Sequence, residues 1–213
     1  MQRKIIDEMN DAAEQILTFW FGALDGPADV DRGKKDLWWA GGAEADAQIA
    51  AQFGALATRA RAGELDQWAA EPRGCLALVV LLDQFGRSLG RGTAAAFAGD
   101  GAALEICRGA IVRGHDKHLR PIERTFLYMP LMHAEDRGAA RQSVEIYQAL
   151  SEEIKALGVD YPDSKSDAVE HATIVERFGR FPHRNAILGR ESTPEEKAFL
   201  ADGGPTFGQK AKA

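Results

Sequence analysis

The fold of this 213-residue chain is decided by the stretch Cys75-Leu-Ala-Leu-Val-Val-Leu-Leu-Asp-Gln-Phe85. A continuous apolar run of this kind is compatible with either a buried strand or a buried helix. Its length, together with the helical patterns that flank it, favours a helix that is apolar on nearly every side. Because such a helix needs apolar neighbours all round, we place it at the centre of the fold.

Amphipathic patterns on both sides of this stretch predict further helices. Thr193 and Glu196 form a capping box around Pro194, which is a strong signal for the start of the last helix. The predicted helices span residues 11–21, about 43–62, about 101–113, 121 onward with a kink at Pro130, 139–157, about 166–178 and 193–200, with a helical turn at 65–70.

We find no convincing strand, interdomain linker or low-complexity tract in the sequence. The prediction is therefore all-α: a single-domain antiparallel helical array over residues 1–201. Asp160–Ser166 is predicted to form a turn, and residues 202–213 a loose C-terminal tail.

Composition and charge exclude several classes of function. A net charge of −6 and a pI near 5.4 argue against nucleic-acid binding, which needs a basic face. No apolar run approaches the length that spans a bilayer, and the polar residues 1–10 lack a signal-peptide core. Cys75 and Cys107 have neither metal-ligand nor disulfide spacing, so we expect buried free thiols in a soluble, cytoplasmic protein.

Three titratable residues fall where the helical pattern calls for an apolar side chain: Asp83, His133 and His171. A buried charge without a partner costs several kcal/mol or shifts its pKa, so each of them should be paired. Arg87 lies four residues after Asp83, and Asp136 lies three residues after His133. A histidine beside a carboxylate can transfer protons, so the candidate catalytic residues are Asp83, His133, Asp136 and His171.

Residues 177–190 place four arginines among phenylalanines, a histidine and an asparagine. Arginine beside aromatic rings indicates either a partly desolvated anion site or a rigid structural cluster. Two more arginines follow the central helix, in a glycine-containing loop. The candidate anion-binding residues are Arg87, Arg91, Arg180, His183, Arg184 and Asn185.

Motifs for metals, nucleotides and serine nucleophiles are absent from the sequence. We find no His-Glu-x-x-His helix, EF-hand loop, P-loop, Gly-x-Gly-x-x-Gly or Gly-x-Ser-x-Gly. Several arginines near the candidate site would also repel a cation. We therefore expect no metal and no cofactor, and the sequence names no reaction.

Long motifs in a fixed order resemble those of the domain of unknown function 924 family, which is bacterial. They include Leu82–Arg87, Arg91–Thr93 with Ala96-Phe97, Tyr128–Asp136, Arg177–Arg190 and Ser192–Glu196, so the resemblance covers nearly the whole chain. It implies an all-helical fold with a tetratricopeptide-like superhelical arrangement, although no 34-residue repeat is found in the sequence. The family brings no established activity.

Three hypotheses about function stay open at this point. In the first, a pocket inside the helical array binds a small anionic ligand, a carboxylate or a phosphate, with histidine acid–base chemistry. In the second, a tetratricopeptide-like groove binds a peptide partner. In the third, the arginine-rich segment only ties helices together through buried ion pairs. The first predicts that residues 177–190 lie close to both 83–91 and 133–136.

Overall fold

The computed structural model describes residues 2–158 and 164–209, and every regular element in them is helical. Residues 160–163 of the predicted turn and residues 210–213 of the predicted tail lie outside the described residues. The α-helices are α1 (Gln2–Phe21), α2 (Lys35–Trp39), α3 (Ala43–Arg61), α4 (Pro72–Val79), α5 (Phe85–Leu89), α6 (Asp100–Arg113), α7 (Pro121–His133), α8 (Arg137–Ala156), α9 (Lys165–Phe178) and α10 (Pro194–Ala201).

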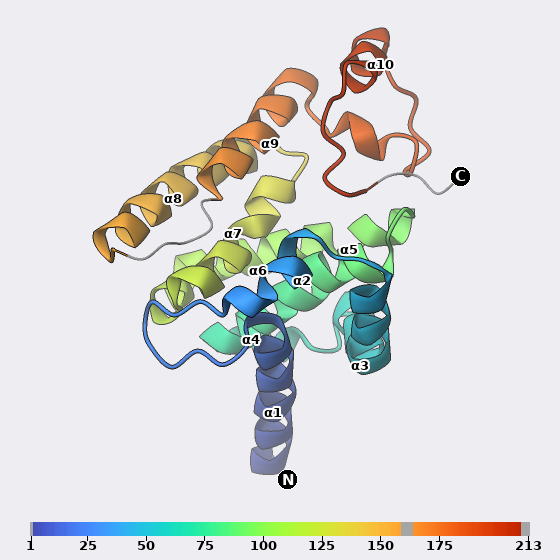
Figure 1. Ribbon diagram of the computed structural model, residues 1–213. Helices are drawn as coiled ribbons and strands as arrows, with labels where there is room; N and C mark the ends of the chain where they lie inside the picture. The colour runs from blue at the N-terminus through green and yellow to red at the C-terminus, as the bar shows by residue number, and fades with distance from the viewer. Residues whose placement is uncertain (1, 159–163, 210–213) are drawn as a thin grey trace.

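The predicted central helix is confirmed, and it consists of three parts. Helix α4 passes through a π-helical turn, Val80–Gln84, into α5. Residues 75–83 are at most 1% exposed, because α1, α3, α6 and α7 pack around them (Figure 1). A π turn is rare and often marks a functional site, and this one carries Asp83 in its buried interior.

The end of helix α7 determines where the next helix, α8, begins. Helix α7 continues through Pro130 and ends at His133, after which Ala134 is extended with a ψ of 138°. The chain then turns, and the carboxylate of Asp136 caps α8 by accepting a hydrogen bond from the backbone N–H of Ala139 at 2.7 Å. Helices α8 and α9 lie side by side and extend away from the central helices (Figure 1).

The C-terminal part of the chain folds back over the end of α7. Gly179 ends α9 with a φ of 71°, a left-handed conformation that glycine adopts without strain. A 3₁₀ turn, Pro182–Arg184, and α10 follow. Ala140, Ile174, Val175 and Phe181 form a second, smaller core beneath this segment.

The structure corrects the sequence analysis in three places. Residues 202–209 are not a loose tail, because Phe207 packs on His171 and the side chain of Gln209 is buried. Between the helices predicted over residues 11–21 and about 43–62, the chain forms a further short helix, α2. The helix predicted over residues 139–157 spans Arg137–Ala156, and Leu157 is exposed. The tetratricopeptide-like arrangement stays a prediction, and no helix in the described residues is long and apolar enough to cross a membrane.

Candidate functional site

A cavity of about 330 Å³ lies at the junction of α2, α5, α7, α9 and the C-terminal segment. Its apolar lining is dominated by aromatic and methionine side chains, and its polar lining by arginine and histidine. The apolar and aromatic residues are Trp20, Leu37, Trp38, Trp39, Phe97, Met129, Met132 and Phe207. The polar and charged residues are Gln84, Arg87, Ser88, Arg91, His133, Ser164, Asp167, Glu170, His171, His183, Arg184 and Gln209.

Asp83 and His133 form a hydrogen-bonded pair at this cavity. Nδ1 of His133 lies 2.7 Å from Oδ1 of Asp83, whose side chain is fully buried. Burial alone raises the pKa of Asp83, but attraction to His133 and Arg87 and hydrogen bonds from His133 and Gln84 lower it to about 2. The carboxylate is therefore ionised and can only accept, so Nδ1 of His133 carries the proton. Nε2 of His133 has no hydrogen-bond partner among the described residues.

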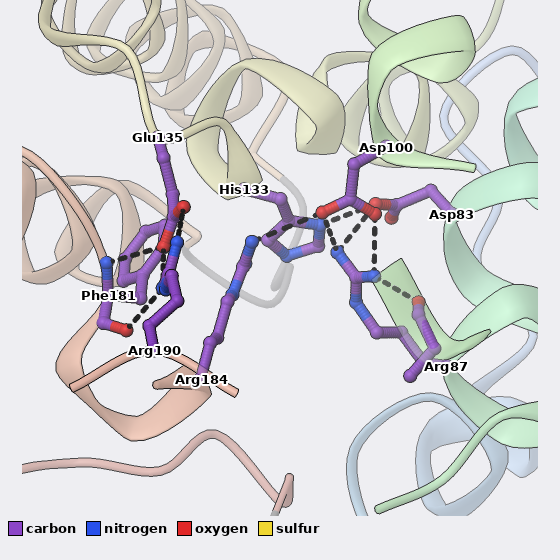
Figure 2. A network of polar contacts seen from close by, with 9 residues as sticks. Asp83, Arg87, Asp100, His133, Glu135, Phe181, Arg184 and Arg190 are labelled. Atoms are coloured by element: carbon purple, nitrogen blue, oxygen red, sulfur yellow. Dashed lines mark hydrogen bonds and ion pairs between the residues drawn. The ribbon is translucent and has the colours of Figure 1, made fainter. Parts of the chain in front are cut away.

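Arg87 connects this pair to Asp100 at the start of α6 (Figure 2). Its Nη1 and Nη2 donate to the two carboxylate oxygens of Asp100 at 2.6 and 3.0 Å. Nη2 also reaches Oδ1 of Asp83 at 3.3 Å, and Nη1 donates to the backbone carbonyl of Ala96. Burial lowers the pKa of Arg87, but the two carboxylates outweigh it and raise the pKa. Arg87 is thus a cation whose charge is fully balanced by the protein.

Arg184 reaches the same carboxylate from the 3₁₀ turn, but it is far less well satisfied. The only hydrogen bond of its guanidinium group among the described residues runs from Nη1 to Oδ2 of Asp100, at 3.1 Å. The guanidinium lies between the rings of Phe97 and Phe181, at 4.6 and 4.4 Å from their centroids. Burial and then the charge of Arg87 lower the pKa of Arg184 to about 10. Arg184 is charged at neutral pH, with most of its donors unused and its charge only partly balanced.

His171 and His183 are neutral rings on the cavity wall. Nδ1 of His171 lies 2.7 Å from the backbone oxygen of Asp167, which can only accept, so the proton sits on Nδ1. Burial, together with neighbouring charges, lowers the pKa of each ring to about 3. Phe207 stacks on His171 with ring centroids 3.9 Å apart. His183 makes ring contacts with Phe181 and Phe207 and no hydrogen bond within the described part of the chain.

Three residues that line the cavity keep buried polar atoms without a hydrogen-bond partner among residues 2–158 and 164–209. These atoms are Nε1 of Trp20, Oγ of Ser164 and Nε of Arg184. A buried polar atom left unsatisfied costs about 1–3 kcal/mol, so such atoms are rare in folded proteins. Three of the six such atoms in the described residues belong to residues around this one cavity, which makes it the candidate site.

The structure brings most of the predicted site residues to this cavity. Asp83 pairs with His133, and the side chains of His133, His171, His183, Arg87, Arg91 and Arg184 line the cavity wall. Arg91 is held by Asp46, with Nε and Nη2 at 2.6 and 2.9 Å from its carboxylate oxygens. The expected proximity of residues 177–190 to 83–91 and 133–136 is confirmed through Asp100 and Glu135.

Asp136 does not orient His133, contrary to the sequence analysis. The i+3 relation assumes that the helix continues, but α7 ends at His133 and the chain turns. The carboxylate of Asp136 instead caps α8 and accepts from Arg108 at 3.3 Å.

Arg180 and Asn185 also lie apart from the cavity, in a C-terminal ion-pair cluster that consists of Glu135, Arg180, Asn185, Arg190 and Glu196. Arg180 donates to both carboxylate oxygens of Glu196 at 2.7 and 2.9 Å. Arg190 donates from all three nitrogens, to Glu135, to Oδ1 of Asn185 and to the backbone oxygen of Phe181. This cluster folds the arginine-rich segment onto α7 and α10, as the structural hypothesis expected for part of it.

Sequence reasoning missed Asp100, Glu135, Trp20 and Phe207. Asp100 lies at the start of α6, where the helix dipole is usually sufficient to explain an acidic residue, so nothing in the sequence indicated its distant partners. Phe207 was assigned to the tail, because no periodic pattern surrounds it. Glu135 alone carried a usable signal, since it lies two residues from His133 and carries a charge opposite to that of the arginine-rich segment.

A second cavity, of about 430 Å³, adjoins the first and shares Phe97, His133 and Arg184 with it. The shared residues place His133 and Arg184 between the two spaces. Within the described residues, no three His, Cys, Asp or Glu side chains are grouped as a metal ion would require.

Comparisons with known proteins agree with the resemblance seen in the motifs. The chain is similar to a solved structure of a protein of unknown function from Agrobacterium tumefaciens, with 37% sequence identity and a TM-score of 0.78. That match covers 92% of this chain and 99% of the other. A comparison with the curated proteins finds no match. Residues 16–204 match the family described as "Bacterial protein of unknown function (DUF924)". The chain therefore belongs to the DUF924 family of bacterial proteins.

Proposed function

We propose that this protein binds a small anionic ligand, a carboxylate or a phosphate, in the 330 Å³ cavity. Arg184 is the principal cationic partner of the anion, and the Asp83–His133 pair exchanges a proton with the bound ligand. The observation that carries the proposal is the incomplete pairing of Arg184, a buried cation whose guanidinium group makes one hydrogen bond among the described residues.

The charges around Arg184 support an anion at that residue, although the rim of the cavity also carries Asp167 and Glu170. Asp83 and Asp100 together carry two negative charges, which Arg87 and Arg184 balance formally, and His133 adds a positive charge whenever it is protonated. Asp100 gives its two shortest contacts to Arg87, so Arg184 receives only part of its charge. An anion beside Arg184 would accept its unused donors, and such charge-assisted bonds are the strong ones in proteins.

The size and lining of the cavity favour a small molecule over a peptide. A volume of about 330 Å³ lies at the low end of the range for small-molecule sites, which run from about 300 to 1,000 Å³. The walls combine tryptophan and methionine side chains with a few convergent polar groups, as such sites usually do. A peptide-binding groove is the alternative prediction, and no comparable feature of residues 2–158 and 164–209 favours it.

Proton exchange follows from the geometry of His133. Its Nδ1 donates to the ionised carboxylate of Asp83, which fixes the tautomer and the ring orientation. Nε2 is then the atom that takes a proton from the ligand or returns it. This arrangement of a carboxylate, a histidine and an adjacent anion-binding cation fits acid–base catalysis on the anion.

Calorimetric titration with 3-phenylpropionate and with n-propyl phosphate tests the binding proposal. Each probe carries one anionic group on an apolar body that fits the cavity. We expect the Arg184→Met variant to lose at least about tenfold in affinity for the probe that binds, because it keeps the volume but removes the charge. The matched control is Arg141→Met, which removes an exposed arginine of α8 that pairs with Glu176.

Equal affinities in Arg184→Met and in the wild type would overturn the proposal, as would failure of both probes to bind the wild type at millimolar concentration. His133→Gln tests the proton step separately. It should leave affinity within about threefold while abolishing the proton uptake or release that accompanies binding, measured by titration in buffers of different ionisation enthalpy.

A further inference from the structure

One face of α9 supplies groups of a different kind from the arginines. Ser164, Asp167, Glu170 and His171 line the cavity at spacings of three and four, so they share one side of the helix start. Carboxylates and a neutral imidazole are hydrogen-bond acceptors, whereas Arg87, Arg91 and Arg184 can only donate. The cavity therefore has a donating side, formed by α5, the loop after it and the 3₁₀ turn, and an accepting side formed by α9.

His171 is the most buried of these acceptors and has a fixed role. It is 7% exposed, and its Nδ1 proton is engaged by the backbone oxygen of Asp167 at 2.7 Å. Nε2 must then carry a lone pair, and it has no hydrogen-bond partner among the described residues. Phe207 stacks on one face of the ring and Phe181 contacts it edge-on, so the ring cannot turn away without losing both contacts. Because His171 lines the cavity, a ligand that carries a hydrogen-bond donor can pair with Nε2 in place of water.

We propose that the site selects an anion that also carries a hydroxyl group, with Arg184 binding the anionic group and Nε2 of His171 accepting the hydroxyl proton. This inference rests on the proposed function and names the ligand class as a hydroxycarboxylate or a hydroxyalkyl phosphate. A polar site of this kind discriminates strongly, because a ligand without the hydroxyl leaves the buried acceptor unpaired.

An ammonium group is the competing donor, since an amino acid also combines a carboxylate with a donor. The surroundings of His171 disfavour it. Burial lowers the pKa of His171 most, and the nearby charges of His133 and Arg184 lower it further. A field that opposes protonation of the ring also opposes an ammonium beside it, whereas an uncharged hydroxyl is unaffected. Asp167 and Glu170 are exposed at the cavity rim, where water screens their charge.

The test is a calorimetric comparison of probes that differ at one position. The first series is 3-phenyllactate, phenylalanine and 3-phenylpropionate, which carry a hydroxyl, an ammonium and a hydrogen on the same carbon. The second is 2-hydroxypropyl phosphate and n-propyl phosphate, and the two series distinguish a carboxylate from a phosphate. We expect the hydroxylated probe of one series to bind at least about tenfold more tightly than its deoxy analogue, with phenylalanine the weaker ligand.

His171→Phe then assigns the preference to its residue. The phenyl ring keeps the contacts with Phe181 and Phe207 but has no acceptor, so the ratio of hydroxylated to deoxy affinity should fall to within about threefold. Affinity for the deoxy probe should stay within about threefold of the wild type. The matched control is His118→Phe, at an exposed histidine outside the cavity, which should leave the ratio unchanged.

Nitrogen-15 NMR of histidine side chains gives a measurement that needs no variant. The hydroxylated probe should shift the resonance of the unprotonated Nε2 of His171, and the deoxy probe should leave it in place. The inference is overturned if the preference survives in His171→Phe, if phenylalanine binds more tightly than 3-phenyllactate, or if that resonance does not respond. Arg184-dependent binding of the deoxy probes with no hydroxyl preference would sink this inference alone, whereas loss of all anion binding would sink the proposed function with it.

Discussion

Arg184 and Arg190 lie six residues apart in one arginine-rich segment, yet the protein treats them in opposite ways. Arg190 donates from all three nitrogens to Glu135, Asn185 and the backbone of Phe181. Arg184 donates from one nitrogen, to a carboxylate that Arg87 already binds with two bonds. This difference in satisfied donors, which composition does not reveal, is our reason for assigning Arg190 to the fold and proposing Arg184 for ligand binding.

The largest expected effect on stability lies in the C-terminal ion-pair cluster, at Glu196. This carboxylate is 2% exposed and accepts from Arg180, Asn185 and the backbone N–H of Thr193. Glu196→Ala should lower the free energy of unfolding by about 2–4 kcal/mol, measured by urea denaturation, because several partners lose their acceptor at once. Glu195→Ala is the matched control, because its exposed pair with Arg177 should contribute less than about 1 kcal/mol. Equal losses in the two variants would contradict a structural role for the cluster.

The second expected effect separates the cavity histidines from the buried carboxylates by the pH at which each loses its contribution to stability. The pKa values of His171 and His183 are lowered to about 3, so both rings stay neutral when folded while the unfolded chain binds protons below about pH 6.5. Stability should be full above that pH and fall as the pH drops, by roughly 2 kcal/mol per histidine at pH 5. The carboxylates Asp83 and Glu196, with pKa values near 2, contribute stability that is lost only below about pH 4.

Unfolding free energies between pH 8 and pH 4.5 test this separation. His183→Asn should flatten the profile between pH 6.5 and pH 5 by roughly 2 kcal/mol, because one proton-linked term is removed. A profile that is flat in the wild type, or unchanged in the variant, would show that the cavity histidines are protonated in the folded protein.

A smaller effect is expected at the C-terminal segment that covers the cavity. Phe207 stacks on His171 at 3.9 Å and has a φ of 49°, an unusual conformation for a residue with a side chain. Phe207→Ala should cost about 1 kcal/mol of stability and, by admitting water, raise the pKa of His171 toward its ordinary value. The C2 proton shift of His171 across pH reports that pKa, and an unchanged pKa would mean that Phe207 does not shield the ring. Thr206→Ala is the neighbouring control.

The all-helical fold could be predicted from the sequence because the spacing of apolar residues is a local signal. The helix faces that this spacing marks are the ones that pack in the folded protein. The apolar run before Asp83 could be buried only inside a ring of helices, and the position of Asp83 on that run required a partner. Burial of Asp83 and His171 followed from the same counting of helical turns. The resemblance to the DUF924 family, seen in motifs spread along the chain, agreed with this all-helical interpretation.

The partners were less predictable, because they depend on how helices end and on contacts between distant segments. Asp136 was matched with His133 by helical spacing, but a helix end between them turned the carboxylate away. The true partner, Asp83, lies fifty residues earlier in the chain, at 2.7 Å. Phe207 and Asp100 were missed for a similar reason, since neither lies in a pattern that indicates its neighbours. Local rules thus predicted pairs within one helix, such as Asp83 with Arg87, but could not predict pairs between distant segments.

The smallest expected effect on stability is that of Arg184→Met, and it tests most directly whether Arg184 and Arg190 have different roles. Arg184→Met keeps the length of a side chain packed between Phe97 and Phe181, and Asp100 retains its two bonds from Arg87. Because removing a poorly balanced buried cation relieves as much as it loses, the unfolding free energy should change by less than about 1 kcal/mol. Arg190→Met should instead lose about 2 kcal/mol or more, since Glu135 is left without its cation. Urea denaturation of the two variants side by side decides the matter: equal losses would mean that Arg184 holds the fold together as Arg190 does, and that its unused donors do not mark a binding site.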